Sequence, residues 1–76
     1  MDWAQNVIVD PKIMGGKAVI KGTRVPVLVI LGGLSGGDSI DEVCEGYGIT
    51  HEDVRAALAY AAETLEHAAV YQIPSR

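Results

Sequence analysis

The amino-acid sequence predicts a mainly α-helical domain in which an N-terminal β-hairpin precedes three helices. Three observations indicate this fold class. Two short β-branched runs, Val7–Val9 and Ala18–Ile20, lie on either side of a loop that contains proline and glycine. A capping-box pattern begins at Ser39, and apolar residues then recur at helical spacing until Gly48. A longer, alanine-rich pattern with the same spacing follows Thr50.

The hairpin and the turn that leaves it are predicted over residues 5–24. The first run ends at Asp10-Pro11, and the loop continues through Gly16 before the second run begins. β-Branched residues favour strands, whereas proline and glycine interrupt them. An isolated two-stranded hairpin is barely stable in water. We therefore expect this hairpin to pack on the helices or to pair with strands of another chain.

The first helix is predicted to begin at Pro26, because proline is tolerated at the first helical position. Its inner face has apolar residues at i, i+3, i+4 and i+7: Val27, Ile30, Leu31 and Leu34. Leu28 and Val29 are also apolar but lie off that face. Two interpretations stay open for them, a contact with a second copy of the chain or a cover for the hairpin of the same chain. The glycines between Gly32 and Gly37 end the helix.

Two further helices are predicted on either side of a short turn at Gly48. The second helix opens with the Ser39-x-x-Glu42 capping box and has an apolar stripe of Ile40, Val43, Cys44 and Tyr47. The third helix, capped by Thr50, reaches about Ala69 and has a predicted buried stripe of Val54, Ala57, Leu58, Ala61, Leu65 and Ala68. The short connection has the spacing of a helix-turn-helix. The three helices fall within residues 25–70, and residues 71–76 form a tail.

The length of 76 residues predicts a single domain over residues 1–76. A chain this short buries only about 60% of its unfolded surface, and such domains usually depend on a disulfide, a metal or a partner chain. The single cysteine cannot form an internal disulfide, and with two histidines it is a poor ligand set for structural zinc. We therefore expect a homodimer.

Charge is unevenly distributed along a chain whose net charge is −4. Residues 1–37 carry four basic and two acidic residues, whereas residues 38–76 carry two basic and eight acidic residues. The acidic whole disfavours strong nonspecific nucleic-acid binding. The N-terminus lacks the layout of a secretory signal, and the longest apolar run, Val25–Leu34, is too short to span a membrane. The sequence thus predicts a cytoplasmic protein.

No motif for nucleotide, metal or catalytic chemistry is complete in this sequence. Gly16-Lys17 is followed by Ala18 rather than serine or threonine, and Asp38 stands where a phosphate loop needs lysine. His67 lies four residues after Glu63, which is the spacing of a helical side-chain pair. We therefore expect no catalytic, cofactor-binding or metal-binding residue and a protein that is not an enzyme.

The helix-turn-helix spacing has two interpretations. A helix that reads base edges needs hydrogen-bond donors near its N-terminus. Here Arg55 is the one strong donor, and Glu52 and Asp53 repel phosphates. The same spacing also serves simply to pack three helices, and the composition favours this second interpretation.

The first half of the chain carries a family resemblance. The segments Asp10-Pro11-Lys12-Ile13-Met14-Gly15-Gly16 and Gly22-Thr23-Arg24-Val25-Pro26-Val27 resemble the signature of the domain-of-unknown-function 433 family. Downstream, Gly37–Val43, Tyr47 and Thr50–Ala61 resemble the second half of that family. One departure is Ala18, where many members have proline. The resemblance covers nearly the whole chain except the first few residues and the tail.

This resemblance implies a homeodomain-like three-helix domain with an N-terminal hairpin, often dimeric. It also implies an antitoxin of a bacterial type II toxin–antitoxin pair, which neutralises a PIN-like, metal-dependent ribonuclease and regulates its own operon. The alternative is a stand-alone helix-turn-helix transcriptional regulator that binds DNA without a toxin partner. A purely structural dimerisation module is a third interpretation.

Candidate binding residues follow from charge and hydropathy. The candidates for DNA are Lys12, Lys17, Lys21, Arg24 and Arg55. The candidates for partner proteins are Leu28 and Val29 for a second copy, and Glu63, Glu66, Tyr71 and Ile73 for the ribonuclease. Thr23 is expected to bond the backbone of its turn, and Arg24 has a second interpretation as a brace onto backbone carbonyls or Asp10.

Overall fold

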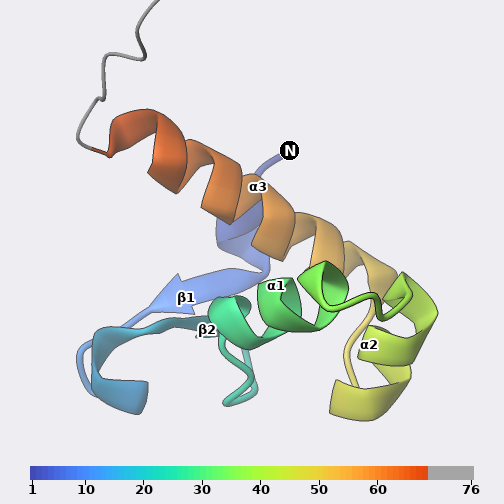
Figure 1. Cartoon of the computed structure of the whole chain (residues 1–76). Helices are drawn as coiled ribbons and strands as arrows, with labels where there is room; N and C mark the ends of the chain where they lie inside the picture. Colours follow the sequence, from blue (N-terminus) through green and yellow to red (C-terminus); the bar gives the residue numbers. More distant parts are fainter. Residues whose placement is uncertain (69–76) are drawn as a thin grey trace, which may run out of the picture.

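The computed structural model describes residues 1–68 of the chain and contains a two-stranded hairpin followed by three helices (Figure 1). The strands are β1 (Val7–Val9) and β2 (Ala18–Ile20), and the helices are α1 (Val27–Ser35), α2 (Ile40–Tyr47) and α3 (His51–His67). Two short 3₁₀ helices, η1 (Trp3–Gln5) and η2 (Met14–Gly16), precede the two strands. The mainly helical fold class predicted from the sequence is therefore confirmed.

The two strands pair antiparallel as predicted. Val7 lies opposite Ile20, Ile8 opposite Val19, and Val9 opposite Ala18. Val19 also forms a bridge with Pro26, so the segment entering α1 continues along the second edge of the hairpin. Pro26 is the N-cap of α1 rather than its first helical residue, one position from the prediction. The hairpin is thereby tied to α1 within the same chain.

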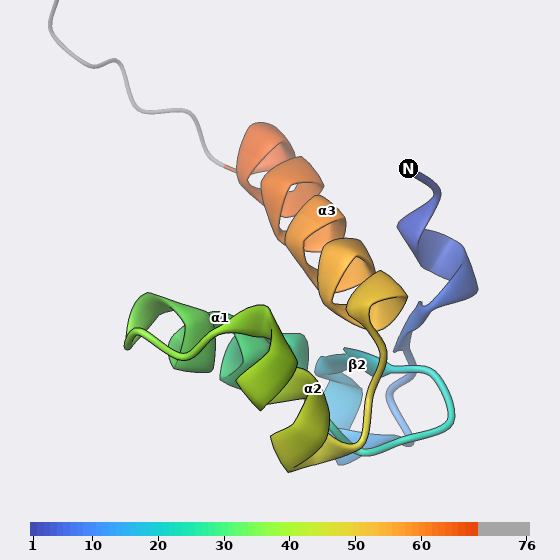
Figure 2. The ribbon, with the colours of Figure 1, turned by 90° about the vertical axis from the view of Figure 1, so that its right-hand side faces the viewer.

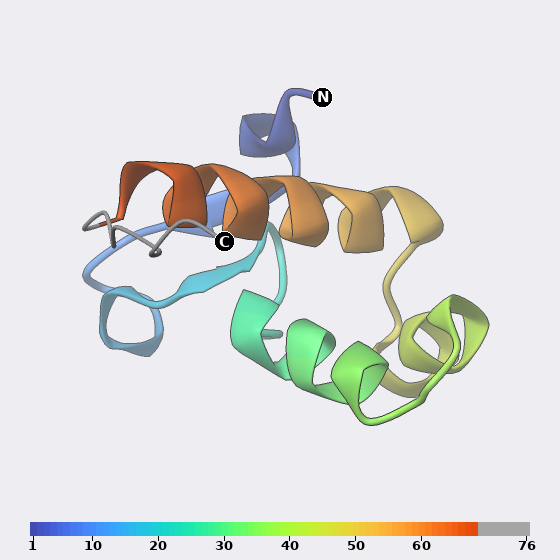
Figure 3. The ribbon, with the colours of Figure 1, turned by 45° about the horizontal axis from the view of Figure 1, so that its top comes forward.

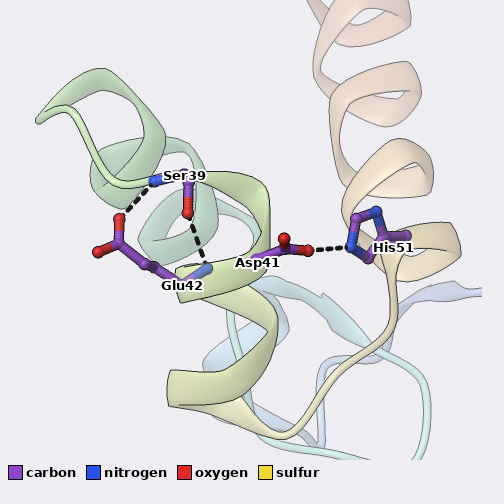
Figure 4. Close-up of polar contacts among 4 residues, drawn as sticks. All are labelled: Ser39, Asp41, Glu42 and His51. Carbon is purple, nitrogen blue, oxygen red and sulfur yellow. Dashed lines mark hydrogen bonds and ion pairs between the residues drawn. The ribbon is translucent and has the colours of Figure 1, made fainter.

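The ends of α2 and α3 are fixed by their capping residues. The hydroxyl of Ser39 accepts from the backbone N–H of Glu42, and the Glu42 carboxylate accepts from the backbone N–H of Ser39 (Figure 4). Thr50 and Asp53 form an equivalent pair at the start of α3. Gly48 ends α2 in the left-handed conformation, with φ 68° and ψ 38°. These contacts confirm the predicted α2 start and the turn between the two helices.

The core lies where α3 crosses the hairpin on one side and α1 and α2 on the other. Its buried side chains are Val7, Val19, Ile20, Val27, Ile30, Val43, Ile49, Val54, Ala56 and Ala57. Figures 2 and 3 show α3 running along the molecule, with its C-terminal half extending past the other helices. Among residues 1–68, no helix combines the length and the apolar composition that crossing a membrane requires.

The predicted buried stripe of α3 is wrong at Leu58, Leu65 and Ala68, whereas Ala61 is half-buried. Val54 and Ala57 are buried, but Leu58 is 42% exposed and Leu65 is 76% exposed. Ala56, which the stripe omitted, is fully buried because the hairpin and η1 cover that side of α3. Residues 62–68 are all exposed, since α3 continues beyond the elements that could cover it. The helix ends at His67, and the predicted end near Ala69 lies outside the described residues.

Candidate partner-binding surfaces

An open apolar groove of about 420 Å³ lies between the start of β2, the first turns of α1 and the second half of α3. It is lined by Lys17, Ala18, Pro26, Val27, Leu28, Leu31, Tyr60, Ala61, Thr64 and Leu65. Leu28 is 72% exposed, so it does not cover the hairpin of its own chain. Val29, its neighbour, is 38% exposed. The structure therefore leaves both side chains accessible to a partner, as the first of the two sequence interpretations requires.

Trp3 joins the N-terminal segment to α3, a contact that no sequence pattern predicted. Its ring meets that of Tyr60 edge to face, with centroids 4.8 Å apart and planes at 83°. Its indole Nε1–H donates to Glu63 Oε1 at 3.0 Å. Sixty residues separate Trp3 from Glu63 in the sequence, so no local pattern relates them. This contact places an aromatic pair beside an exposed carboxylate.

Glu63 and Glu66 both lie exposed on α3. Glu63 accepts its hydrogen bond from Trp3, and among the ion pairs of residues 1–68 it is not joined to His67, so the predicted helical pair is wrong. Tyr71 and Ile73, also assigned to the ribonuclease, lie outside the described residues. The acidic candidates that the structure does describe therefore share the exposed part of α3.

The basic candidates of the first half lie exposed on the hairpin and on the turn that follows it: Lys12, Lys17, Lys21 and Arg24. Thr23 holds this turn as predicted, since its hydroxyl donates to the Ile20 carbonyl at 2.7 Å and accepts from the Val25 N–H at 3.0 Å. Within residues 1–68, Arg24 makes no hydrogen bond or ion pair. The interpretation of Arg24 as a brace is therefore wrong, because the Thr23 side chain and the backbone bond from Ile20 N–H to the Val25 carbonyl hold the turn without it.

Acidic side chains lie around the first turn of α3. Arg55 Nη2 lies 3.8 Å from Oε1 of Glu52, which precedes it by about one turn of the same helix. His51 Nε2 lies 2.6 Å from Asp41 Oδ1 and joins the start of α3 to α2 (Figure 4). Carboxylates near Arg55 disfavour the approach of a DNA phosphate. Both interpretations of the helix-turn-helix stay predictions, and these carboxylates are the feature that counts against base reading by α3.

Asp53 is the anchor that connects α3 to the N-terminal segment. The side-chain amide of Asn6 donates to Asp53 Oδ1 at 2.9 Å, and the backbone N–H of Thr50 donates to Oδ2 at 3.0 Å. Partial burial favours the neutral acid, but these hydrogen bonds together outweigh it and lower the pKa of Asp53. Asn6 also accepts the Lys21 N–H on its carbonyl at 2.7 Å. One asparagine therefore links α3 to the end of the hairpin.

Cys44 is half-buried against the core, and desolvation with the charges of Asp41 and Asp53 raises the pKa of its thiol. The thiol is therefore protonated at neutral pH and packs as a small apolar side chain. Within residues 1–68, no three histidine, cysteine or acidic side chains are grouped as metal ligands would be.

The fold and its surfaces define a small hairpin-and-three-helix domain with separate apolar, acidic and basic surfaces. The family model described as "Protein of unknown function (DUF433)" matches residues 7–61 of this chain. The chain belongs to that family. The resemblance seen in the sequence is thereby confirmed.

Two solved structures are similar to this chain. A DUF433 member protein from Anabaena variabilis is 34% identical with a TM-score of 0.75, and the match covers 83% of this chain and 64% of that one. Rv2018 from Mycobacterium tuberculosis is 36% identical with a TM-score of 0.62, and the match covers 68% of this chain and 24% of that one. Both therefore share its fold and a recognisable part of its sequence.

A curated relative is the uncharacterized protein y4eO of Sinorhizobium fredii, which is 36% identical over 53 residues. The match covers 68% of this chain and 24% of that protein. This chain therefore spans about a quarter of the length of y4eO and of Rv2018, and about two thirds of the Anabaena chain.

Proposed function

We propose that this protein is an antitoxin-like binding protein of a type II toxin–antitoxin pair, which neutralises a PIN-like ribonuclease and binds its own operator. The observation that supports this proposal is the separation of charge. The exposed cations Lys12, Lys17, Lys21 and Arg24 belong to the hairpin and its turn. Residues 38–68 contain eight acidic residues and a single arginine. Figure 1 shows the hairpin and α2 at opposite ends of the molecule, so the acidic residues of α2 lie apart from the basic hairpin.

The ribonuclease is assigned to the outer surface of α3 and η1. An enzyme that cleaves RNA has a basic groove for phosphates, and carboxylates are complementary to it. Glu52 and Glu63 are exposed on α3, and Trp3 and Tyr60 adjoin Glu63. Tryptophan and tyrosine are common among residues that dominate binding energy at protein interfaces. In this proposal the two carboxylates occupy positions that RNA phosphates would otherwise fill.

The operator is assigned to the hairpin rather than to α3. DNA affinity depends on lysine and arginine at phosphates, and the basic side chains of the hairpin and turn are exposed. Arg55 on α3 is flanked by Glu52 and faces no such concentration of positive charge. Binding of operator DNA to the hairpin is expected to be weak and to fall steeply as the salt concentration rises.

A paired experiment tests the two assignments. The product of the neighbouring gene is purified, its RNA cleavage is measured with increasing amounts of this protein, and operator binding is measured by gel shift at two salt concentrations. The double variant E52Q/E63Q keeps an acceptor for Trp3 but loses two charges. It is expected to raise the concentration for half-inhibition at least tenfold while leaving the gel shift intact. The double variant K21A/R24A is expected to weaken the gel shift and to leave the concentration for half-inhibition unchanged. R55A is expected to weaken the gel shift less than K21A/R24A does.

The outcomes of these two measurements separate the antitoxin proposal from the alternative of a stand-alone regulator. If no nuclease activity accompanies the neighbouring gene and K21A/R24A still abolishes the gel shift, the protein is a stand-alone regulator. If E52Q/E63Q inhibits the nuclease as well as the unaltered protein does, the acidic surface is not the binding site. Loss of operator binding in R55A alone would place DNA recognition on α3.

A further inference from the structure

We propose that two copies of this chain pair through the exposed side of α3, antiparallel and related by a two-fold axis. This pairing does not depend on the nuclease and operator assignments above, although Tyr60 and Lys17 also line the groove that it includes. Its elements are an uncovered apolar stripe, a pair of opposite charges at matching positions and the groove beside them.

The apolar stripe consists of Leu58, Ala62 and Leu65, which recur at i, i+4 and i+7 and therefore lie on one side of the helix. Leu58 is 42% and Leu65 is 76% exposed, and Ala62 is exposed as well. An exposed helix side with this spacing matches the contact surface of a helix pair. The small residue in the middle allows two helices to approach closely at that point.

Two-fold symmetry specifies which residues meet. When two copies of α3 run antiparallel about an axis between Ala61 and Ala62, Leu58 of one copy lies opposite Leu65 of the other. The two contacts are equivalent, as symmetry requires. The stripe is thus complementary to itself in the antiparallel orientation.

The charges beside the stripe have the same symmetry. Arg55 and Glu66 are eleven residues apart, about three helical turns, so they lie on the same flank of the stripe. In the antiparallel pair each Arg55 lies about 3 Å along the axis from the position of the other copy's Glu66, at a rise of about 1.5 Å per residue. The Arg55 side chain is 66% exposed, and reaching across would replace its 3.8 Å contact with Glu52 on the same helix. Each dimer would contain this ion pair twice.

The apolar groove extends this contact to α1. Leu28 and Leu65 line the same groove, so a second helix placed against Leu65 also comes close to Leu28. The stripe and the charge beside it lie partly outside residues 7–61, which the family model matches, because Ala62, Leu65 and Glu66 follow them. The contact assigns Glu66 to a second copy rather than to the ribonuclease.

Charge exchange tests the pairing without disturbing the core, because both charged positions are exposed. The full chain is studied by sedimentation equilibrium over a range of micromolar concentrations and is expected to show a species of twice the chain mass. R55E places two carboxylates at each contact, and E66R places two guanidinium groups there. Like charges at an interface are unfavourable, so each variant is expected to raise the dissociation constant at least tenfold.

The decisive measurement mixes the two variants in equal amounts. In a mixed dimer, the introduced carboxylate of the R55E chain meets the introduced guanidinium group of the E66R chain, and Glu66 of the former meets Arg55 of the latter. Both contacts then have opposite charges, so the mixture is expected to recover a dimer that neither variant forms alone. The doubly exchanged chain R55E/E66R restores opposite charges at both contacts and is expected to recover the original dissociation constant within about threefold. K21E, which makes the same kind of charge change as R55E on the exposed turn, is the control and is expected to dimerise normally.

Three results would overturn the proposal. The first is an unaltered chain that stays monomeric throughout the concentration range. The second is single variants that dimerise as well as the unaltered chain, or a doubly exchanged chain that fails to recover dimers. The third is a dimer that survives the charge exchanges but is lost when residues 69–76 are removed, because the tail would then make the contact.

Discussion

Single residues decide how the N-terminal segment is attached to the rest of the molecule. Asn6 reaches Asp53 across 47 positions of sequence, and Trp3 reaches Glu63 across 60. Neither contact follows from a motif, because both depend on where the hairpin packs against α3. In contrast, Thr23 and Ser39 bond backbone groups within three residues, and the sequence predicts both. Local hydrogen bonds are readable from sequence to the extent that their partners are near neighbours.

The lowered pKa of Asp53 predicts how stability depends on acid. In the folded protein the pKa of Asp53 lies below its ordinary value of 3.8. The ionised Asp53 carboxylate therefore stabilises the fold fully above pH 3.8, and this stabilisation is lost as the pH falls below 3.8. Asn6→Ala removes one of the hydrogen bonds that lower the pKa, so acid unfolding is expected to begin at a higher pH. Circular dichroism over the acid range up to neutral pH measures the shift, and Gln5→Ala is the control on the same segment. Equal acid midpoints for both variants would contradict this account of Asp53.

The elements show which sequence patterns are sufficient and which are not. The start of α2, the Gly48 turn and the hairpin follow from capping, backbone conformation and β-branched runs. The buried residues of α3 do not follow from its sequence pattern, because helical periodicity identifies one side of a helix without showing which element covers that side. Leu65 continues the predicted stripe but lies beyond the core, and Ala56 is covered by elements far earlier in the chain. The candidate apolar groove was therefore predictable only through Leu28.

Alanine substitutions at two glycines near the end of α2 are expected to change the free energy of unfolding in opposite directions. Gly46 lies inside the helix, and a methyl group added there would meet no atom within 4 Å, so Gly46→Ala is expected to stabilise the fold by about 0.4–1 kcal/mol. Gly48 has a φ of 68°, which an alanine side chain disfavours, so Gly48→Ala is expected to destabilise it by about 1 kcal/mol. Urea unfolding of both variants measures the two changes. Destabilisation of similar size at both positions would show that α2 does not end at Gly48.

At the scale of the whole molecule, a small core supports a surface with three distinct regions. The basic hairpin and the acidic α2 lie at opposite ends of the molecule (Figure 1). The open groove lies between the hairpin, α1 and α3. The net charge of −4 alone does not show this arrangement. The two halves of opposite sign were visible in the sequence, but the position of the acidic α2 at the end of the molecule away from the hairpin depends on the fold (Figure 1).

The contrast between Leu28 and Ile30 tests the division between core and partner surface. Ile30 is fully buried, so Ile30→Ala is expected to lower the free energy of unfolding by about 2–5 kcal/mol. Leu28 is mostly exposed. In dilute solution, where the chain is monomeric, Leu28→Ala is therefore expected to change the free energy of unfolding by less than about 0.5 kcal/mol. At high concentration Leu28→Ala is expected to reduce dimerisation. A large loss of stability in dilute Leu28→Ala would mean that this side chain supports its own hairpin after all.

The uncovered second half of α3 links the lifetime of the protein to its abundance. Residues 62–68 are exposed, and apart from the hydrogen bond between Trp3 and Glu63 the rest of residues 1–68 gives this segment little tertiary packing. Such a segment opens locally far more often than the core, and an opened segment exchanges its amide hydrogens and admits a protease. Pairing of two α3 helices would close the same segment and slow both processes. Dilute protein would then be degraded faster than concentrated protein, so that turnover responds to concentration through a few turns of one helix.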